Sequence, residues 1–511
     1  MFLFIACTVD RVYCDDKIPV SVGSSNNFQY IVQISLTGLF SEQELSGVGD
    51  RFMKCGFNVI SATRTNVYLY IGDEELKQLL AYYKDNCKVV YSNSRSMSES
   101  VLSDNQQGED GDEADIMQKS TITLAKMDPE LKRDVLKVYS GFDRVPEGYP
   151  NLNQVNNYLS GLEKRYPGKV KKIQITTKPT FENRHIFGVK ISKNVEKNRD
   201  VPNILVVSAH HSREINTVIT NIAMIEKLLS DPNWEDLLEF NQFYFIPVVN
   251  VDGYEYVFTT NNFWRKNRNV AGVVNGTTVF GIDLNRNYDL GFNSCAGNGS
   301  PNMDTYKGKN AFSEIETSAI RDFTKRIGGV AKVLDFHSSG RQVLTGYTCT
   351  NNAQQDYIKS LGQELATKVG YALRVPSSDG EHQEHQIKEY TSYSFLVEIM
   401  HSHQPPLNET VSEAVQLVSL FEHFAYKPIP LRGHIYDEKS GKPIENALIE
   451  VSGIVWKAGE SRKTNYFGSY YLFLALNKTY ELTITAKGYS PLKASVSLTK
   501  ESTTKDFRLR R

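Results

Sequence analysis

The sequence has little cysteine and no long hydrophobic run. Its 511 residues include six cysteines, and none forms the C-x-x-C pair typical of zinc knuckles and redox centres. No stretch approaches the roughly 20 apolar residues that a membrane-spanning helix needs. The charges show no excess of either sign, with 58 Lys and Arg against 59 Asp and Glu, which disfavours nucleic acid as a partner. We therefore expect a multidomain globular protein without a transmembrane segment.

The N-terminus and the cysteines bear on localisation. Residues 1–27 begin with the apolar stretch MFLFIAC, which is shorter than a complete signal sequence and predicts a truncated signal peptide followed by a tail. Disulfides between Cys55 and Cys87, or between Cys295 and Cys349, would suit an oxidising compartment. Buried free thiols are the alternative. We expect a secreted protein or one of the secretory pathway.

The N-terminal region of the chain, up to residue 139, predicts a small domain and a linker. Within residues 28–93, apolar strand patterns and helical patterns follow one another in the order β-α-β-β-α-β, which predicts an α+β domain of ferredoxin-like form. Residues 94–139 are rich in Ser, Asp, Glu and Gly and contain few large apolar side chains. Such a composition cannot offset the entropy of ordering, so we expect an acidic, flexible linker.

Two further domains follow. In residues 140–428, the apolar runs ILVVSA, FYFIPVVN, VAKVLDFH and YSFLVEIM alternate with helical stretches. This pattern predicts an α/β domain whose mixed, mostly parallel sheet is flanked by helices. In residues 429–511, short strands separated by turn residues predict an all-β sandwich.

Three residues at the ends of predicted strands suit a metal. His211 and Glu214 stand in the segment SAHHSREIN, directly after the strand ILVVSA, and His337 ends the strand VAKVLDFH. The carboxyl ends of strands in an α/β sheet are where ligands bind, so the three side chains should meet at one edge. Two imidazoles and a carboxylate favour zinc, with a fourth position left for water.

Glu398 is the candidate general base. It lies within the apolar strand YSFLVEIM, where a carboxylate is costly without a functional partner. A metal-bound water becomes an effective nucleophile when a nearby base takes its proton. An outward-facing strand residue is the alternative interpretation.

Polar and charged residues in two loops suit an anionic ligand. Arg265 lies in NNFWRKNR, Asn285 and Arg286 lie in GIDLNRNY, and Arg213 is part of the predicted metal loop. Several guanidinium groups near a metal suit a substrate carboxylate and a developing oxyanion. Each of them alone would be typical of a solvated surface charge. Asp283 is positioned to orient a histidine ligand from behind.

Together these residues resemble the zinc carboxypeptidases of the A and B type. The resemblance covers residues 149–426 and rests on seven motifs in order, namely HSRE, NVDGY, WRKNR, GIDLNRNY, TYKGKNAFSEIET, FHS and YSFLVEI. It implies a peptidase that binds one Zn²⁺ and removes the C-terminal residue of peptides or proteins. The implied roles are zinc ligation by His211, Glu214 and His337, general base catalysis by Glu398, oxyanion binding by Arg265, orientation of a ligand by Asp283, and substrate binding by Arg213, Asn285 and Arg286.

The flanking domains also resemble parts of carboxypeptidases. Residues 28–93 are similar to the activation domain that keeps pancreatic-type enzymes latent. Residues 429–511 resemble the transthyretin-like sandwich of the regulatory N and E types. The resemblance implies a zymogen activated by cleavage between about Arg95 and Arg133.

This sequence departs from the family in its substrate-binding region. No tyrosine stands where the family has its capping tyrosine, and Tyr371 and Tyr390 fit poorly by spacing. Ser339 and Gly340 follow the third ligand in place of the pancreatic type's tyrosine. A count back from Glu398 places Gln383 at the floor of the specificity pocket, between Glu381 and Glu384, which favours a C-terminal Lys or Arg. The acidic partner expected near Thr348 is not evident.

Alternatives remain at the level of function. The chain could be a non-catalytic zinc-containing binding protein, or an endopeptidase or amidase on the same scaffold. The pairs His382 with His385 and His401 with His403 suit a further metal site less well than ordinary loop histidines. A monomer is favoured.

Overall fold

The computed structural model describes residues 30–36, 39, 52, 58–62, 66–71, 73–83, 87–92, 148–348, 354–454, 459–460 and 462–511. The predicted signal peptide, N-terminal tail and acidic linker lie outside the described residues. The chain divides into two compact units. The first comprises Met1–Asp143, Ala271–Phe280 and Gly297–Tyr306, and the second comprises Arg144–Val270, Gly281–Ala296 and Lys307–Arg511.

The first unit contains a four-stranded antiparallel sheet with the order β2-β3-β1-β4, as a ferredoxin-like domain requires. Val32 and Ile34 point to one face of this sheet and are fully buried, and helix α2 packs against β1 and β4. The predicted helix over residues 41–55 lies outside the described residues apart from Phe52. The elements are β1 (Tyr30–Ser35), β2 (Asn58–Ala62), β3 (Asn66–Ile71), α2 (Asp73–Tyr83) and β4 (Cys87–Ser92).

Of the two cysteines that the structure describes, one is a free thiol and the other is in a disulfide. Cys87 is a buried free thiol, so the pairing with Cys55 is wrong and the alternative of a buried thiol holds for this residue. Burial raises the pKa of the Cys87 thiol to about 12, which keeps it protonated at neutral pH. Cys295 is disulfide-bonded, whereas Cys349, its predicted partner, lies outside the described residues.

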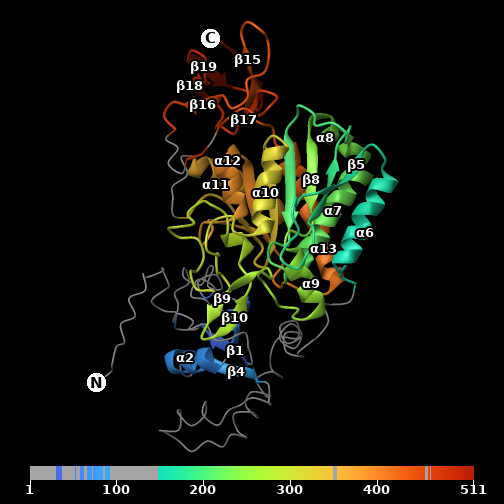
Figure 1. The fold of residues 1–511 in the computed structure, drawn as a ribbon, viewed down its shortest axis with the longest axis vertical. Helices are drawn as coiled ribbons and strands as arrows, with labels where there is room; N and C mark the ends of the chain where they lie inside the picture. The colour runs from blue at the N-terminus through green and yellow to red at the C-terminus, as the bar shows by residue number, and fades with distance from the viewer. Residues whose placement is uncertain are drawn as a thin grey trace, which may run out of the picture. The chain divides into compact units, whose positions relative to one another are not determined.

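An eight-stranded sheet forms the centre of the second unit (Figure 1), with the order β13-β12-β14-β11-β7-β8-β6-β5. The pairs along β14-β11-β7-β8 and the pair β12-β13 are parallel, and the other pairs are antiparallel. The predicted mixed, mostly parallel sheet is therefore confirmed. Its strands are β5 (Val170–Gln174), β6 (Phe187–Ile191), β7 (Asn203–Ser208), β8 (Gln242–Ile246), β11 (Lys332–Ser338), β12 (Gln342–Leu344), β13 (Ala372–Arg374) and β14 (Tyr393–Ile399).

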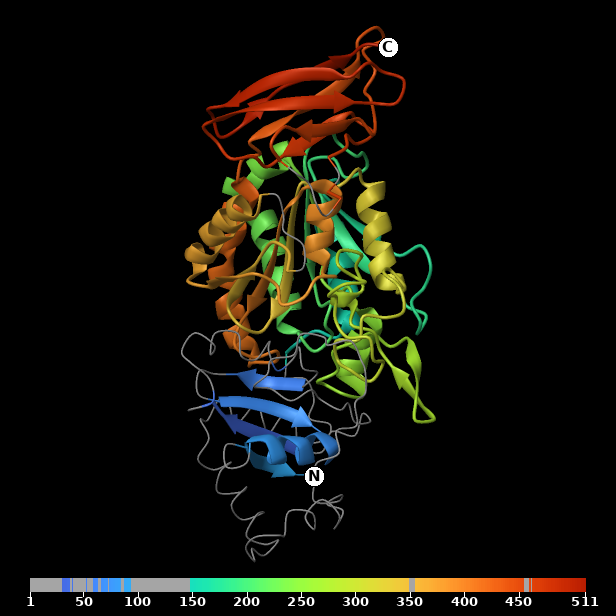
Figure 2. The ribbon, with the colours of Figure 1, turned by 90° about the vertical axis from the view of Figure 1, so that its left-hand side faces the viewer.

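Helices cover both faces of this sheet (Figure 2). Along β8, Phe243 and Phe245 pack against Phe421 of α13 on one face, and Tyr244 packs against Phe323 of α10 on the other. Burial on both faces explains why the central strands are continuous apolar runs. The helices of this region are α6 (Leu152–Arg165), α7 (Asn216–Ser230), η2 (Pro232–Trp234), α8 (Glu235–Phe240), α9 (Val251–Thr259), η3 (Leu284–Arg286), α10 (Ile315–Arg326), α11 (Gln355–Val369), α12 (His382–Tyr390) and α13 (Leu407–Tyr426). A separate two-stranded sheet of β9 (Val270–Val274) and β10 (Thr277–Phe280) belongs, apart from Val270, to the first unit.

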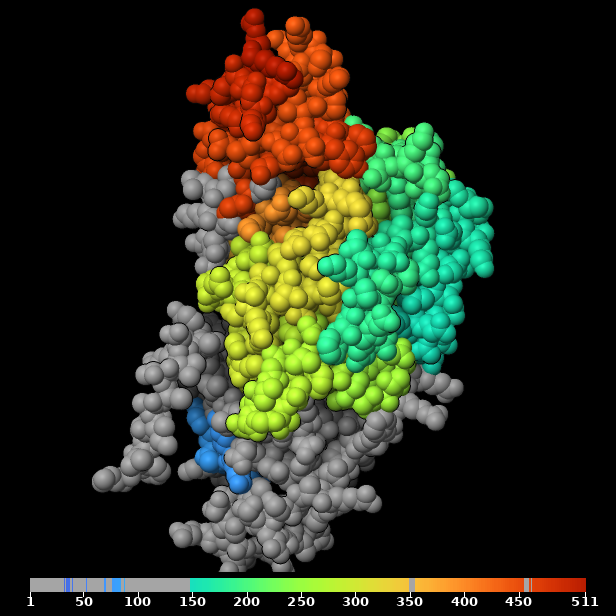
Figure 3. Space-filling view, in the orientation of Figure 1, coloured from blue at the N-terminus to red at the C-terminus, as the bar shows by residue number. Residues whose placement is uncertain are grey.

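The C-terminal part of the second unit is the predicted β-sandwich. Buried and partly exposed residues alternate along β15, and the buried ones join a separate apolar core. The ring of Phe473 stacks on Tyr393 of β14, with centroids 5.1 Å apart, so the sandwich packs directly against the α/β region (Figure 3). Its strands are β15 (Leu431–Asp437), β16 (Leu448–Val451), β17 (Ser469–Leu472), β18 (Lys478–Thr485), β19 (Leu492–Leu498), β20 (Thr503–Thr504) and β21 (Phe507–Leu509). None of the helices in the described ranges has the length and apolarity to cross a bilayer.

Candidate metal centre

The structure brings together the three predicted metal ligands. His211 and Glu214 lie in the turn between β7 and α7, and His337 is the last residue but one of β11. Because β7 and β11 are adjacent parallel strands, their carboxyl ends lie side by side and place the three side chains at one edge of the sheet. All three side chains are buried.

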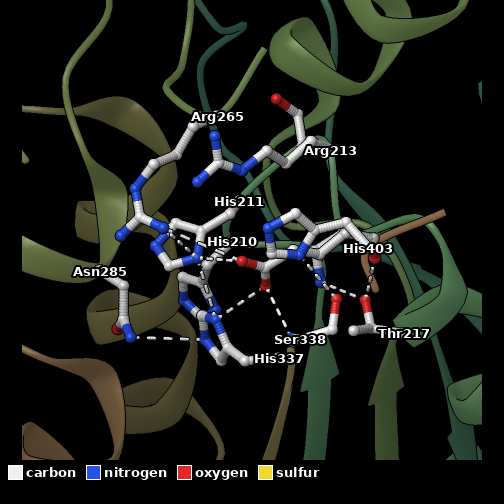
Figure 4. A network of polar contacts seen from close by, with 12 residues as sticks. His210, His211, Arg213, Thr217, Arg265, Asn285, His337, Ser338 and His403 are labelled. Carbon is white, nitrogen blue, oxygen red and sulfur yellow. Dashed lines mark hydrogen bonds and ion pairs between the residues drawn. The ribbon is translucent and has the colours of Figure 1, made fainter. Parts of the chain in front are cut away.

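The ligand atoms converge within hydrogen-bond distance of one another (Figure 4). His211 Nδ1 lies 2.8 Å from Glu214 Oε1 and 3.1 Å from His337 Nδ1, and His337 Nδ1 lies 3.1 Å from Glu214 Oε2. Tetrahedral zinc with bonds of about 2.0–2.2 Å places its ligand atoms roughly 3.3 Å apart, so this donor set fits the ion.

A carboxylate contacts the far nitrogen of each histidine. Asp283 Oδ1 lies 3.1 Å from His211 Nε2, and Asp335 Oδ1 lies 3.3 Å from His337 Nε2. A proton on each Nε2 leaves the two Nδ1 atoms free to bind a metal. Burial opposes the charge of Glu214, but His211 and His337 outweigh it and hold the pKa of Glu214 well below its usual range. The glutamate is thus in its ligating, ionised form.

Arg265 lies beside the ligands. Its Nε and Nη2 donate to Asp283 Oδ2 over 3.1 and 2.8 Å, and its Nη1 lies 3.1 Å from His211 Nδ1. Burial opposes the charge of Asp283, but Arg265 and then His211 outweigh it and keep the pKa of Asp283 well below its usual range. Arg213 is also buried and extends its guanidinium group towards Arg265 (Figure 4). Two cationic groups therefore border the ligand cluster.

Glu398 is placed by strand register. In the parallel pair of β11 and β14, Glu398 is the partner of His337. Paired residues on neighbouring strands direct their side chains to the same face, so Glu398 lies on the same face as His337 and not among the apolar side chains of the other face. It is partly exposed, as an acid that exchanges protons with water requires.

Asn285 and Arg286 lie in η3, next to the ligand cluster. Asn285 Nδ2 is 3.4 Å from His337 Nε2. Arg286 Nη1 donates to Glu381 Oε1 over 2.9 Å, and Gln383 Nε2 donates to Glu381 Oε2 over 2.5 Å. The predicted carboxylate-binding arginine and the predicted pocket-floor residue therefore meet at one acidic side chain.

A second group of possible ligands lies behind the first. His210, Asp335 and His382 are completely buried and bring their ligand atoms within 4.8 Å of one another. Asp335 contacts His210 Nδ1 at 3.1 Å and His382 Nδ1 at 3.0 Å, while the other nitrogens contact Tyr288 and Gln386. His210 and Asp335 were not predicted from the sequence, although an Asp within the apolar strand VAKVLDFH is as costly to bury without a partner as Glu398 in YSFLVEIM.

Neither of the two histidine pairs considered from the sequence forms a metal site by itself among the described residues. His382 contacts Asp335, whereas His385 Nδ1 lies 2.7 Å from Asp289. His403 Nδ1 lies 3.2 Å from the hydroxyl of Ser338, beside the candidate centre. Closeness along the chain does not bring these imidazoles to one point, because a helix and a loop direct neighbouring side chains to different partners.

Other expectations about the substrate region can be compared with the structure. The Tyr371 hydroxyl contacts Glu413, and that of Tyr390 contacts Thr324, so neither is directed to the ligand cluster. The backbone N–H of Thr348 donates to Asp379 Oδ1 over 2.6 Å. The acidic group next to Thr348 is thus Asp379, which comes from a segment about thirty residues further along the chain.

Comparisons with known proteins match both parts of the second unit. Residues 155–404 match the model of a family described as zinc carboxypeptidase, and residues 430–510 match the carboxypeptidase regulatory-like domain. A zinc carboxypeptidase of Simulium vittatum is 33% identical over 226 residues, which cover 43% of this chain and 71% of the relative. Carboxypeptidase B of Helicoverpa zea is 34% identical over 199 residues, covering 39% and 46%.

Among solved structures, carboxypeptidase A from Helicoverpa armigera superposes with a TM-score of 0.58 at 20% identity, covering 78% of this chain and 98% of the other. Thrombin-activatable fibrinolysis inhibitor gives a TM-score of 0.53 at 18% identity, with the same coverage. These likenesses show the fold. In sequence, the chain spans about half the length of several of the curated relatives that it matches.

Proposed function

Since the chain belongs to the zinc carboxypeptidase family, we propose that it hydrolyses the C-terminal peptide bond of peptides or proteins. The proposal rests above all on the convergence of His211, Glu214 and His337 at one strand edge, with Glu398 beside His337. One zinc ion held by these three residues would polarise the scissile carbonyl and lower the pKa of a bound water towards about 7.

The protein's own groups then act on the substrate. The Glu398 carboxylate takes a proton from the attacking water and passes it to the nitrogen of the leaving amine. Arg265, supported by Asp283, donates hydrogen bonds to the oxyanion that forms from the carbonyl oxygen. Asn285, Arg286 and Arg213 bind the terminal carboxylate, since a guanidinium group can donate two hydrogen bonds to a planar anion.

The role of Glu398 as general base can be tested by substitution. Glu398→Gln keeps the shape of the side chain and removes the base, so we expect stoichiometric zinc and a loss of turnover of about 10²- to 10⁴-fold. Metal analysis and steady-state hydrolysis of a peptide with a free C-terminus measure the two effects. Glu422→Gln, at an exposed position of α13, is the control. Undiminished turnover by Glu398→Gln would rule out this role.

Two alternative functions can be distinguished from a carboxypeptidase by the C-terminus of the peptide that is cleaved and by the dependence of cleavage on zinc. An exopeptidase fails on a peptide whose C-terminus is amidated, whereas an endopeptidase or amidase cleaves it. A zinc-containing binding protein cleaves neither peptide. Dipicolinate should abolish hydrolysis and added zinc should restore it if the metal participates.

The resemblance to carboxypeptidases also bears on the localisation, oligomeric state and activation of the whole chain. We infer that it is secreted and monomeric, and that it is made as a latent zymogen whose residues 28–93 act as the prodomain. The ferredoxin-like strand order of this domain and the sequence resemblance support the latter. Size-exclusion chromatography with light scattering measures the oligomeric state.

A further inference from the structure

Arg286 already binds a carboxylate of its own chain. Its Nη1 donates to Glu381 Oε1 over 2.9 Å, and both side chains are almost completely buried. This is the arginine to which the proposed function assigns the terminal carboxylate of the substrate. Glu381 therefore occupies a hydrogen-bonding direction that the substrate would use.

The position of Glu381 is fixed by the start of α12. Glu381 is the N-cap residue of this helix, and its backbone N–H donates to Glu384 Oε2 over 3.2 Å. The backbone N–H of His382 donates to Asn285 Oδ1 over 2.8 Å, which attaches the helix start to η3. Hydrogen bonds from the backbone N–H groups of Glu381 and His382 thus hold the start of α12 near η3. The ion pair of Glu381 with Arg286 involves only side-chain atoms, so each side chain can take another partner without a change in the backbone.

The surroundings of Glu381 are rich in buried acceptors. Asp379, Glu381 and Glu384 are all buried within six residues of chain. Gln383 Oε1 and Glu384 Oε1 have no hydrogen-bond partner among the described residues. Burial raises the pKa of Glu381 and, together with the charge of Glu381, that of Glu384. A ligand that brings a positive charge and several N–H donors would satisfy this group.

We propose that Glu381 determines specificity by exchanging partners: the terminal carboxylate of the substrate displaces it from Arg286, and it then binds the cationic side chain of a C-terminal Lys or Arg. The inference rests on the proposed function and names its substrate class. A basic C-terminal residue replaces one buried ion pair with two. A neutral residue leaves the Glu381 carboxylate buried without its partner, which is strongly unfavourable.

The test uses two peptides that differ only in a final Lys or Leu, with the zinc-loaded full chain. The wild type should prefer the Lys peptide. Glu381→Gln should lower kcat/KM for the Lys peptide by about tenfold or more. For the Leu peptide its KM should stay equal or fall, because Arg286 is no longer held. The matched control is Glu389→Gln, an exposed position of the same helix, which should behave as the wild type.

A packing defect would lower both activities together, so equal losses on the two peptides, or an unchanged preference, would overturn the exchange. Glu381→Asp keeps the charge on a shorter side chain and should retain more of the Lys preference than Glu381→Gln. An equal loss of preference in both variants would contradict the role of charge.

Binding separates this inference from the proposed function. Calorimetric titration with N-acetyl-lysine and N-acetyl-leucine reports recognition without turnover. If the wild type cleaves neither peptide, both before and after trypsin has cut the predicted linker, the proposed function fails. A wild-type preference for N-acetyl-lysine that Glu381→Gln removes still supports the role of Glu381, and equal binding of both compounds by the wild type refutes it.

Discussion

Asp283 and Asp335 support the two histidine ligands in the same way. Each carboxylate contacts the Nε2 atom of one ligand, and each also contacts other buried groups. Asp283 binds Arg265 with its second oxygen, while Asp335 contacts the imidazoles of His210 and His382. Asp283 thus links the candidate metal centre to Arg265, and Asp335 links it to His382 at the start of α12.

The role of Asp335 can be tested through zinc affinity. Asp335→Asn removes the negative charge behind His337 and places an N–H donor against imidazole N–H groups, so we expect zinc to bind about 10- to 100-fold more weakly. Competition with a chromophoric chelator measures the change. Asp322→Asn, an exposed position of α10, should leave zinc affinity unaltered. An unchanged affinity in Asp335→Asn would show that Asp335 does not position the ligand.

The candidate site could be predicted residue by residue only in part. The convergence of His211, Glu214 and His337 could be predicted, because the first two follow one apolar strand closely and His337 lies at the end of another. The contact of His382 with Asp335 could not be predicted in this way, since the start of α12 brings His382 to the sheet from a distant segment of the chain. The contact of Arg286 with Glu381 likewise depends on the packing of η3 against α12.

At the level of elements, β11 organises the centre. It carries Asp335 and His337 two residues apart, so both side chains lie on one face, and its register with β14 adds Glu398. The sequence predicted both strands from their β-branched runs. It could not predict that they are neighbours, because about fifty residues separate them and pairing is decided by the packing of the intervening helices.

The first residue of β11 has a separate role at the end of α13. The Lys332 ammonium group donates to the carbonyl oxygens of Phe424, Ala425 and Lys427 over 3.2, 2.6 and 2.6 Å. These carbonyls lack partners within the helix, so Lys332 acts as its C-terminal cap. Burial, with a smaller contribution from the charge of Lys427, lowers the pKa of Lys332 to about 7.

This depressed pKa predicts a pH dependence of stability. Between pH 7 and pH 10 the unfolded chain binds a proton at Lys332 more tightly than the folded chain, so the free energy of unfolding should rise with pH. From pH 7 to pH 9 the contribution is about 2 kcal/mol. Urea unfolding at both values should show this rise in the wild type and in the exposed control Lys325→Met, but not in Lys332→Met. Equal slopes in all three proteins would contradict a buried, titrating Lys332.

Across the full length of the chain, the change from long apolar runs to short strands with turn residues predicts a domain boundary at residue 429. The predicted boundary at residue 429 lies next to the start of β15 at Leu431 and of the family match at residue 430. The boundary is visible because a strand of a sandwich buries alternate residues, whereas the strands of the α/β sheet are buried on both faces. The packing of Phe473 on Tyr393 was not foreseeable, since an aromatic residue directly after a strand fits either core equally well.

The similarity of residues 28–93 to an activation domain predicts that the intact chain has low activity until the linker is cut. Trypsin should cut first within the predicted linker, where Arg95, Lys119, Lys126, Lys132 and Arg133 supply basic sites. A prodomain that blocks the active site nine tenths of the time leaves about one tenth of the activity, so cleavage should raise kcat/KM about tenfold.

Mass spectrometry of the fragments and peptide hydrolysis before and after cleavage measure the two effects together. A chain with all five basic residues replaced by Gln is the control, because it should resist the cut and keep its low activity. If the cut chain and the intact chain hydrolyse the peptide at the same rate, residues 28–93 do not inhibit the enzyme. Their similarity to an activation domain would then extend to the fold alone.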